Sequence, residues 1–340
     1  MPTTAATHSG ITTAKELMGA WAIDRFDDPT NEPSLLSLER LPVPKVEPRD
    51  VLVQMHGAEV GNWDAILARG EWPVERPFPV VLGVGGAGTV AAVGTDVADF
   101  AKGDRVYTFS HPHSHPGCPS RDHNGAWAEF MLVPFDRVAH APASLDLVHA
   151  GACPLRALTA HESVVSILRV EKDDVLLVTA AAGGVGQLAI QLAARRGAHV
   201  VAIARARHHD YLRAFGAETV IDYTREDLVE ATVDRYPGGV DKALNGVVGE
   251  TASKVLQAVR PGGDILDLTL SQTAPVPDRH VISDYIVRPD RERLETIAEM
   301  FDRGELTLDV SHSVPFTRAP DALTEVLQMK GHGIIALAIQ

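Results

Sequence analysis

The chain has 340 residues, enough for two domains of about 150 residues each. Apolar residues make up 45% of it and charged residues 22%, which excludes a disordered, collagen-like or coiled-coil chain. The formal net charge of −14 and the absence of any run of five Lys or Arg residues exclude nucleic acid and anionic membranes as general partners.

The N-terminal sequence predicts a cytoplasmic protein. Residues 1–16 are rich in Thr, Ala and Ser, lack periodicity and are expected to form a flexible leader. They contain neither the apolar core of a secretory signal nor an Arg-rich transit pattern. Two cysteines, Cys118 and Cys153, provide no disulfide framework. Residues 175–194 carry no charge and match a membrane span in length, but their central glycines favour a strand, a turn and a helix.

Short strands at close spacing predict a mostly antiparallel β domain up to about residue 140. The expected strands lie at residues 19–23, 35–40 and 51–55, in the Gly- and Val-rich segment 79–97, and after the charged turn at 102–104. The pattern changes after Pro142 to helices and strands in alternation, which predicts a parallel doubly wound sheet. A helix is expected over 150–168, strands at 175–178, 199–203, 219–221, 240–244 and 265–268, and a last strand over 280–288.

The glycine turn after the first of these strands predicts a dinucleotide site. Ala181, Gly183 and Gly186 stand at the glycine positions of G-x-G-x-x-G, between a buried strand and a helix. Gly183 lets the backbone approach a pyrophosphate, and Gly186 lets the helix pack closely on the strand. The helix N-terminus adds free N–H groups and partial positive charge. We expect the cofactor to contact the turn at Ala182, Gly183, Gly184, Val185 and Gly186.

The end of the second strand predicts NADP(H) rather than NAD(H). NAD-selecting folds carry an acid there for the ribose hydroxyl, but this chain has none between Ile203 and Asp210. Arg205 and Arg207 are two residues apart, so in an extended stretch they face the same side and suit a 2′-phosphate. Two solvated surface arginines are the alternative.

Several motifs in a fixed order resemble the medium-chain dehydrogenase/reductase superfamily, in its zinc-independent quinone-oxidoreductase-like branch. They lie at residues 49–53, 60–64, 86–94, 103–106, 125–130, 158–160, 215–223 and 260–263, in addition to the glycine turn. The resemblance covers about residues 18–340 and implies an α/β fold with two domains. It implies a discontinuous GroES-like catalytic domain (17–140 and 305–340) and a Rossmann domain (141–304), with the active site between them.

The resemblance also implies that the chain uses no metal. Gly61, Val84 and Leu155 stand where zinc-using relatives carry ligands, and Gly85 replaces an acid common in relatives. A structural zinc would need four closely spaced cysteines, and Cys118 is alone. The histidine tract over 111–123 fits no standard zinc spacing, so we expect it to shape one wall of the cleft, with adventitious metal binding as the alternative.

Without a metal, an alkoxide has no stabiliser, whereas a quinone or conjugated C=C delocalises negative charge onto its carbonyl as hydride arrives. The resemblance therefore implies NADPH-dependent reduction of a quinone, an enone or an enoyl substrate. Asn62 is a candidate donor to the substrate carbonyl, and Trp63 a candidate to stack on a flat ring. Further candidate pocket residues are aromatic, with core packing as the alternative: Tyr107, Trp127 and Tyr285. Asp64 is expected to make a structural hydrogen bond.

Further expected cofactor contacts follow from the resemblance: Thr159, Tyr223, Asn245, Val247 and Leu268. Asn245 departs from an Asp of relatives. Two other functions stay open at this point: a crystallin-like protein that binds NADPH without turnover, and a trans-acting enoyl-thioester reductase. Residues 280–288 read as the edge strand of the Rossmann sheet, through which similar proteins form a homodimer.

Overall fold

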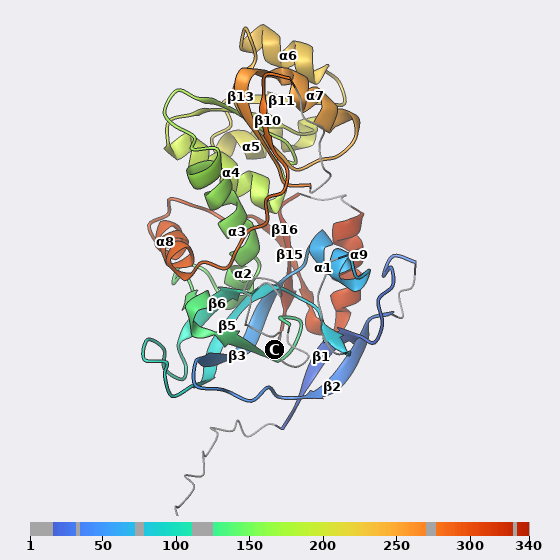
Figure 1. Ribbon diagram of the computed structural model, residues 1–340, viewed down its shortest axis with the longest axis vertical. Coiled ribbons are helices and arrows are strands. Elements are labelled where there is room, and N and C mark those ends of the chain that lie inside the picture. The colour runs from blue at the N-terminus through green and yellow to red at the C-terminus, as the bar shows by residue number, and fades with distance from the viewer. Residues whose placement is uncertain are drawn as a thin grey trace, which may run out of the picture.

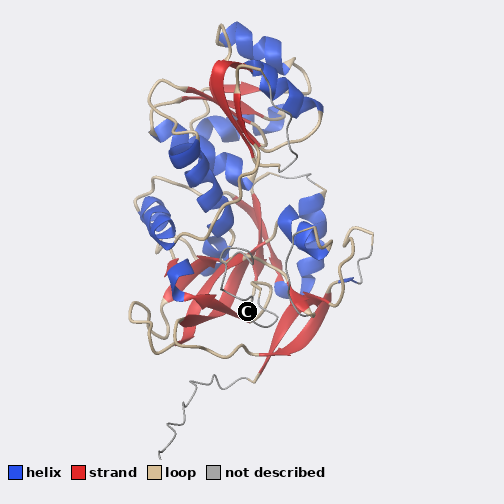
Figure 2. Ribbon diagram, in the orientation of Figure 1, coloured by secondary structure: helices blue, strands red, loops and turns tan. Residues whose placement is uncertain are grey.

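The computed structural model describes residues 16–31, 35–71, 78–110, 125–269, 277–328 and 332–339. The chain forms a β-rich lobe and a lobe built on a parallel sheet, one above the other along the long axis (Figures 1 and 2). The expected leader, apart from Glu16, and the histidine tract lie outside the described residues. Within the described part, no helix is both long and apolar enough to cross a membrane.

The β-rich lobe contains two sheets. The larger has the strand order β15-β16-β3-β5-β6-β8, with β7 also paired to β3. All of its pairs are antiparallel except β15 with β16. These strands are β3 (Asp50–Glu59), β5 (Gly85–Val93), β6 (Arg105–Phe109), β7 (Phe130–Pro134), β8 (Val138–His140), β15 (Val310–Pro315) and β16 (Ile334–Ala338). The smaller sheet has the order β2-β1-β4, with β1 (Leu17–Ile23), β2 (Ser37–Pro42) and β4 (Val80–Val81).

The other lobe contains a six-stranded, fully parallel sheet in the order β11-β10-β9-β12-β13-β14. Its strands are β9 (Val175–Val178), β10 (His199–Ile203), β11 (Thr219–Ile221), β12 (Val240–Asn245), β13 (Val259–Asp267) and β14 (His280–Ile282). Counted from β9, this is the order 3-2-1-4-5-6 of the Rossmann fold. The predicted antiparallel β domain and doubly wound sheet are both confirmed.

The apolar strands of the parallel sheet are covered on both faces. Leu176 and Val200 belong to a core cluster with α3 (Pro154–His161), α4 (Gly184–Arg195), α5 (His209–Ala214) and α8 (Arg291–Asp302). The neighbouring residues Leu177 and Val201 point the other way, to α6 (Leu228–Arg235) and α7 (Glu250–Ala258). Successive strand residues alternate between faces, so a sheet buried on both sides needs a continuous apolar run.

Two expected elements differ from the structure. The single helix over 150–168 is instead α2 (Leu147–Gly151), α3, and a π-helical turn at Glu162–Ile167. Pro154 begins α3 because proline suits a first helical turn but cannot extend the helix before it. The last strand ends at Ile282 rather than at residue 288, and Ile286 beyond it is 49% exposed. Strand β14 lies at the sheet edge, and the homodimer through it stays a prediction.

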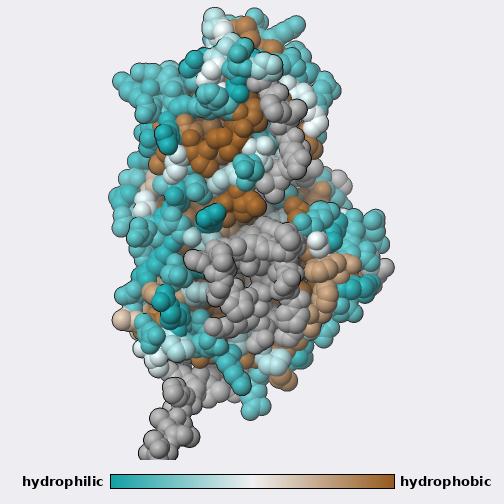
Figure 3. Space-filling view, in the orientation of Figure 1, coloured by the Kyte–Doolittle hydropathy of each residue, from teal (hydrophilic) through white to brown (hydrophobic). Residues whose placement is uncertain are grey.

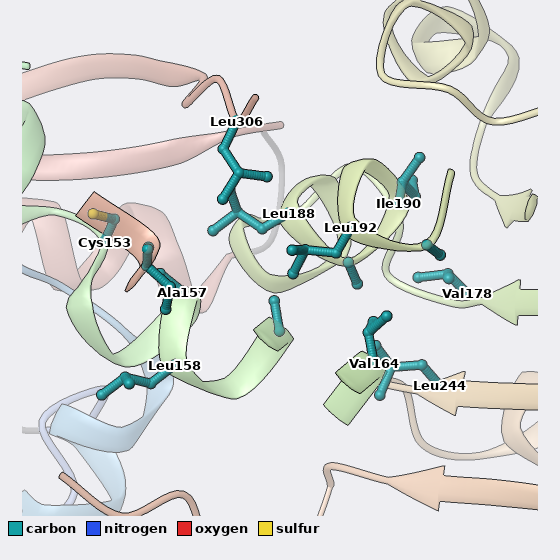
Figure 4. Packing of buried hydrophobic residues seen from close by; sticks show 14 of the residues in the cluster. Cys153, Ala157, Leu158, Val164, Val178, Leu188, Ile190, Leu192, Leu244 and Leu306 are labelled. Atoms are coloured by element: carbon teal, nitrogen blue, oxygen red, sulfur yellow. The ribbon is translucent and has the colours of Figure 1, made fainter. Parts of the chain in front are cut away.

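Helix α3 lies between the two lobes and packs against α4, which belongs to the parallel-sheet lobe, as Figure 1 shows. Leu188 projects from α4 toward Leu306 in the close-up of Figure 4, which also shows Ala157 on α3. All three side chains are buried in one cluster. Helix α2 packs on β3, because Gly57 and Gly151 lack the Cβ atoms that would collide there. The predicted domain limits at residues 140 and 304 stay a proposal.

Candidate functional site

The glycine turn has an open backbone at the start of α4. Gly183 precedes α4 in an extended conformation. Among the described residues, no acceptor binds the backbone N–H groups of Gly184, Val185 and Gly186. A Cβ on Gly183 would meet one atom within 4 Å, the Ala180 carbonyl oxygen at 3.2 Å, so the turn stays open to a ligand. The open backbone and the helix N-terminus fit a dinucleotide pyrophosphate.

Gly186 has a different role. A Cβ there would lie 2.6 Å from the carbonyl oxygens of Ala180 and Ala181 and 2.7 Å from the Ala181 Cα. Only a glycine therefore permits this contact between the start of α4 and the end of β9.

The C-terminal segment of the β-rich lobe meets the same turn. The Gly333 N–H donates to the Ala182 carbonyl at 2.8 Å, and Gly183 and Gly333 form a parallel β-bridge. The turn therefore lies where the lobes join. On the face shown in Figure 3, apolar areas gather on the parallel-sheet lobe and at the level of this junction.

The two arginines after β10 have separate partners. Arg205 Nε donates to the Tyr223 hydroxyl at 3.1 Å, and both side chains are exposed. Arg207 Nε donates to His208 Nε2 at 2.9 Å. The expectation of an extended stretch is wrong, because Ala206–His208 form a 3₁₀ turn. The alternation of side chains in a strand therefore does not apply to these arginines.

The neighbourhood of these arginines is rich in positive charge. The ring of His332, from the C-terminal segment, lies 5.3 Å from that of His208. Burial lowers the pKa of His208 from its ordinary value, and Arg207, His332 and Arg205 lower it further by repelling a proton. An anion bound here would relieve that repulsion.

Other expected cofactor contacts lie at the carboxyl edge of the parallel sheet, where doubly wound sheets bind ligands. Asn245 is buried there and joins three strands: Thr179 Oγ1 donates to its Oδ1 at 2.9 Å, and its Nδ2 donates to Asp267 at 3.2 Å. Val247 and Leu268 are half-buried beside it. Thr159 is buried on α3, with 8% of its surface exposed.

Tyr107 and Trp127 are not pocket residues, which corrects the prediction. Both are fully buried. The Tyr107 hydroxyl donates to the Leu294 carbonyl, and Trp127 Nε1 donates to the Glu59 carbonyl at 2.9 Å. Each aromatic ring fills the core while its polar atom has a backbone partner, as buried Tyr and Trp require.

The hydrogen bond of Tyr285 is made to the segment after α3 and not to the 60–64 loop. Its hydroxyl donates to Glu162 Oε2 at 2.7 Å, on the π-helical turn after α3. Burial and the Glu162 carboxylate raise the pKa of Tyr285 well above its ordinary range. The hydroxyl is therefore a neutral donor that already has an acceptor.

Asn62 and Trp63 begin α1 (Asn62–Ala68). Asn62 is exposed, whereas Trp63 is partly buried and its indole N–H has no partner in the described structure. The ring of Trp63 packs against Arg156, whose guanidinium carbon lies 4.7 Å from the ring centroid. Arg156 thus covers one face of the indole, so that face cannot stack on a flat substrate as we expected.

Sequence reasoning missed a buried charged cluster beside Trp63. Arg156 is 7% exposed, and its Nη1 lies 3.9 Å from Glu59 Oε2. Glu59 Oε1 accepts the Leu155 N–H at 2.7 Å. Asp64 accepts the N–H groups of Gly61 and Gly83 at 2.9 and 3.0 Å, which confirms its predicted structural hydrogen bonds. Two features of the sequence could have indicated this cluster: Glu59 ends an apolar strand, and Arg156 follows Leu155.

The two buried carboxyls share one cation. Burial raises the pKa of Glu59 to about 8 and that of Asp64 to about 7, while Arg156 opposes both shifts. Glu59 therefore keeps its proton near neutral pH.

We expect the protein to lose stability as the pH rises from about 5 to about 8. The folded pKa of Glu59 lies above the 4.5 of an unfolded carboxyl, so its contribution is complete below that value and is lost as the pH passes about 8. Glu59→Gln, which cannot ionise, should flatten the dependence. The measurement is the urea midpoint across this range. The exposed Glu71→Gln is the control, and an unchanged slope in Glu59→Gln would contradict the assignment.

A Rossmann sheet whose glycine turn is joined by a β-rich lobe defines a class of two-domain dehydrogenases and reductases. Comparison with known proteins agrees: residues 47–143 match the alcohol dehydrogenase GroES-like domain family and residues 184–289 the zinc-binding dehydrogenase family.

A probable quinone oxidoreductase of Schizosaccharomyces pombe is 34% identical over 240 residues, 70% of this chain and 68% of that protein. An NADPH-dependent alkenal/one oxidoreductase of Arabidopsis thaliana is 29% identical over 296 residues, 85% of this chain and 72% of that protein. A crystal structure described as an NAD-dependent alcohol dehydrogenase superimposes with a TM-score of 0.85 at 27% identity, covering 95% of this chain and all of that one. The chain belongs to the medium-chain dehydrogenase/reductase superfamily, in its quinone-oxidoreductase-like branch, a family of oxidoreductases that use a nicotinamide cofactor.

Proposed function

We propose that the protein is an NADPH-dependent, zinc-free reductase of a quinone or of the C=C bond of an enone or enoyl substrate. One observation carries the proposal: an open glycine turn adjoins a site whose expected ligand positions hold Gly61, Val84 and Leu155. Such a site can hold a hydride donor but offers no Lewis acid for an alkoxide.

The residues at the site do not fit a catalytic zinc. Zinc takes Cys, His, Asp or Glu ligands, and the described residues contain no group of three that could hold a metal. Glu59 and Asp64, the nearby carboxyls, are already engaged with backbone N–H groups. The histidine tract lies outside the described residues.

The residues fit NADPH better than NADH. Arg205, Arg207 and Tyr223 would hold the 2′-phosphate, and the backbone of Gly184, Val185 and Gly186 the pyrophosphate. The relative from Arabidopsis thaliana is described as NADPH-dependent, whereas the alcohol dehydrogenase of known structure is described as NAD-dependent. The absence of an acid between Ile203 and Asp210 supports NADPH for this chain.

When bound, the dinucleotide supplies a hydride. Where the lobes join, the glycine turn lies on one side of α3 and the Asn62–Trp63 loop lies on the other. Orientation of the acceptor and stabilisation of its oxygen are then the protein's tasks. Solvent provides the proton that completes reduction.

NADPH consumption by the purified protein with a naphthoquinone, an enone and an enoyl thioester tests the proposal. We expect turnover with the quinone or the enone, unaffected by a chelator. Turnover with the thioester alone would favour a trans-acting reductase. Tight NADPH binding without turnover of any acceptor would favour a binding protein and overturn the proposal.

A further inference from the structure

Two buried atoms near Arg156 lack a hydrogen-bond partner in the described structure. Two of its five N–H groups donate to backbone, Nη1 to the Ala152 carbonyl at 3.1 Å and Nη2 to the Val60 carbonyl at 2.6 Å. Within the described structure the Trp63 indole N–H and Glu59 Oε2 are buried without a partner. Buried polar groups are nearly always satisfied, so each exception needs an explanation.

These groups lie among the positions where zinc-using relatives carry ligands. Leu155, at one such position, donates its N–H to Glu59, and Glu59 Oε2 lies 3.6 Å from where a Cβ on Gly85 would be. Gly61, at another, donates to Asp64. The cluster thus contacts three of these positions, and its cation is the Arg156 guanidinium.

Arg156 also borders the cofactor turn. A Cβ on Gly184 would lie 2.3 Å from Arg156 Cδ and 2.6 Å from its Nε, so the side chain lies directly on the first residue of α4. Its other side faces Trp63. The cation is therefore placed between the turn expected to hold the dinucleotide and the loop expected to hold the substrate.

The unpaired Trp63 N–H beside a fixed cation calls for an oxygen acceptor. When the β-carbon of an enone gains hydride, the C=C electron pair moves onto the carbonyl oxygen, and the resulting enolate then takes a solvent proton at the α-carbon. The negative oxygen is the charge that preorganised N–H donors stabilise in a water-poor site. Glu59 accepts the N–H of Leu155, next to Arg156, and its Oε2 lies 3.9 Å from Arg156 Nη1, so it is a positioning residue.

We propose that Arg156, together with the Trp63 indole N–H, binds the carbonyl oxygen of the hydride acceptor and stabilises its negative charge, in place of a metal ion. The proposal rests on the proposed reductase function. It extends that function by naming the protein groups that polarise the carbonyl of the hydride acceptor.

4-Nitrophenol tests the site without hydride transfer, because its phenolate absorbs differently from the phenol. A donor-rich cationic site should bind the phenolate preferentially and lower the apparent pKa of the bound probe by about one unit. Arg156→Met should abolish that shift, and Trp63→Phe, which keeps a ring but removes the N–H, should reduce it. The shift should also be lost in Arg156→Met/Glu59→Gln. This double variant leaves no buried ionisable carboxyl at Glu59 without its cation, and so guards against a single variant that merely misfolds.

Activity gives the second readout. Arg156→Met should lower kcat about a hundredfold, the loss typical of an oxyanion donor, while the Kd for NADPH changes less than about threefold. Arg156→Lys should restore part of kcat because it keeps the charge. Arg196→Met is the matched control, since Arg196 donates to the Val170 carbonyl at the opposite end of α4.

An unshifted probe in the unmodified protein, or an unchanged kcat in a folded Arg156→Met, would overturn the proposal. A shifted probe without turnover of any acceptor would instead support this anion site while contradicting the reductase function. The two failures are therefore distinguishable.

Discussion

Replacing Arg205 and Arg207 together by Ala is expected to weaken NADPH binding at least about a hundredfold and to leave NADH binding nearly unchanged. A charge-assisted hydrogen bond to a phosphate contributes about 1.5–3 kcal/mol, and NADH carries no 2′-phosphate to receive it. Arg205 is held beside Tyr223 by a hydrogen bond of 3.1 Å, so its guanidinium is already placed. Titration of cofactor fluorescence with both coenzymes measures the effect.

The matched control is Arg225→Ala. Arg225 lies two residues after Tyr223, and its side chain is 76% exposed beside Asp222. A general loss of positive charge would weaken NADPH in the control as well. Equal losses of NADPH and NADH in the double variant would contradict the assignment to the 2′-phosphate.

The contact of Arg205 and Arg207 with the 2′-phosphate should also make the preference for NADPH depend on salt concentration. Interactions between exposed charges are screened at higher ionic strength. Arg205 and Arg207 are exposed, so the preference for NADPH over NADH should shrink as salt is added. The same salt titration on the double variant should change this preference far less.

Features encoded by neighbouring residues were predictable from the sequence. Gly183 and Gly186 act within one strand–turn–helix unit, and their spacing sets the geometry wherever that unit folds. The parallel pairing of the strands follows from the alternation of strands and helices along the chain. The break at Pro154 was visible in principle, because a proline in that position starts a new helix.

The cluster around Arg156 was not predictable in the same way. Glu59 and Leu155 are 96 residues apart in the chain and meet across the two lobes. The raised pKa of Glu59 depends on its complete burial, which residue type alone does not reveal. Tyr107 and Trp127 were misjudged for the same reason: an aromatic residue near a cleft in sequence can lie wholly in the core.

The local backbone conformation after β10 also could not be predicted from the sequence. Arg205 and Arg207 suggested a strand by their spacing, but the chain turns at Ala206–His208. The turn brings His208 beside His332, which belongs to a segment more than a hundred residues later. His332 is one of the groups that lower the pKa of His208, and no sequence pattern around residue 205 predicts this contact.

Gly183→Ala and Gly186→Ala are expected to fail in different ways, although the two glycines belong to one turn. A methyl group at residue 186 would lie 2.6 Å from two carbonyl oxygens, and both belong to backbone that cannot move freely. Gly186→Ala should therefore lower the free energy of unfolding by about 1–3 kcal/mol and abolish NADPH binding with it. Urea unfolding and fluorescence titration measure the two effects.

A methyl group at residue 183 would meet one oxygen at 3.2 Å, which a small shift relieves. Gly183→Ala should keep the stability of the protein within about 1 kcal/mol. It should still weaken NADPH at least about tenfold, because the methyl group occupies the space where the pyrophosphate approaches the backbone. Unchanged NADPH affinity in Gly183→Ala would place the pyrophosphate elsewhere, and wild-type stability in Gly186→Ala would refute the close contact of α4 with β9.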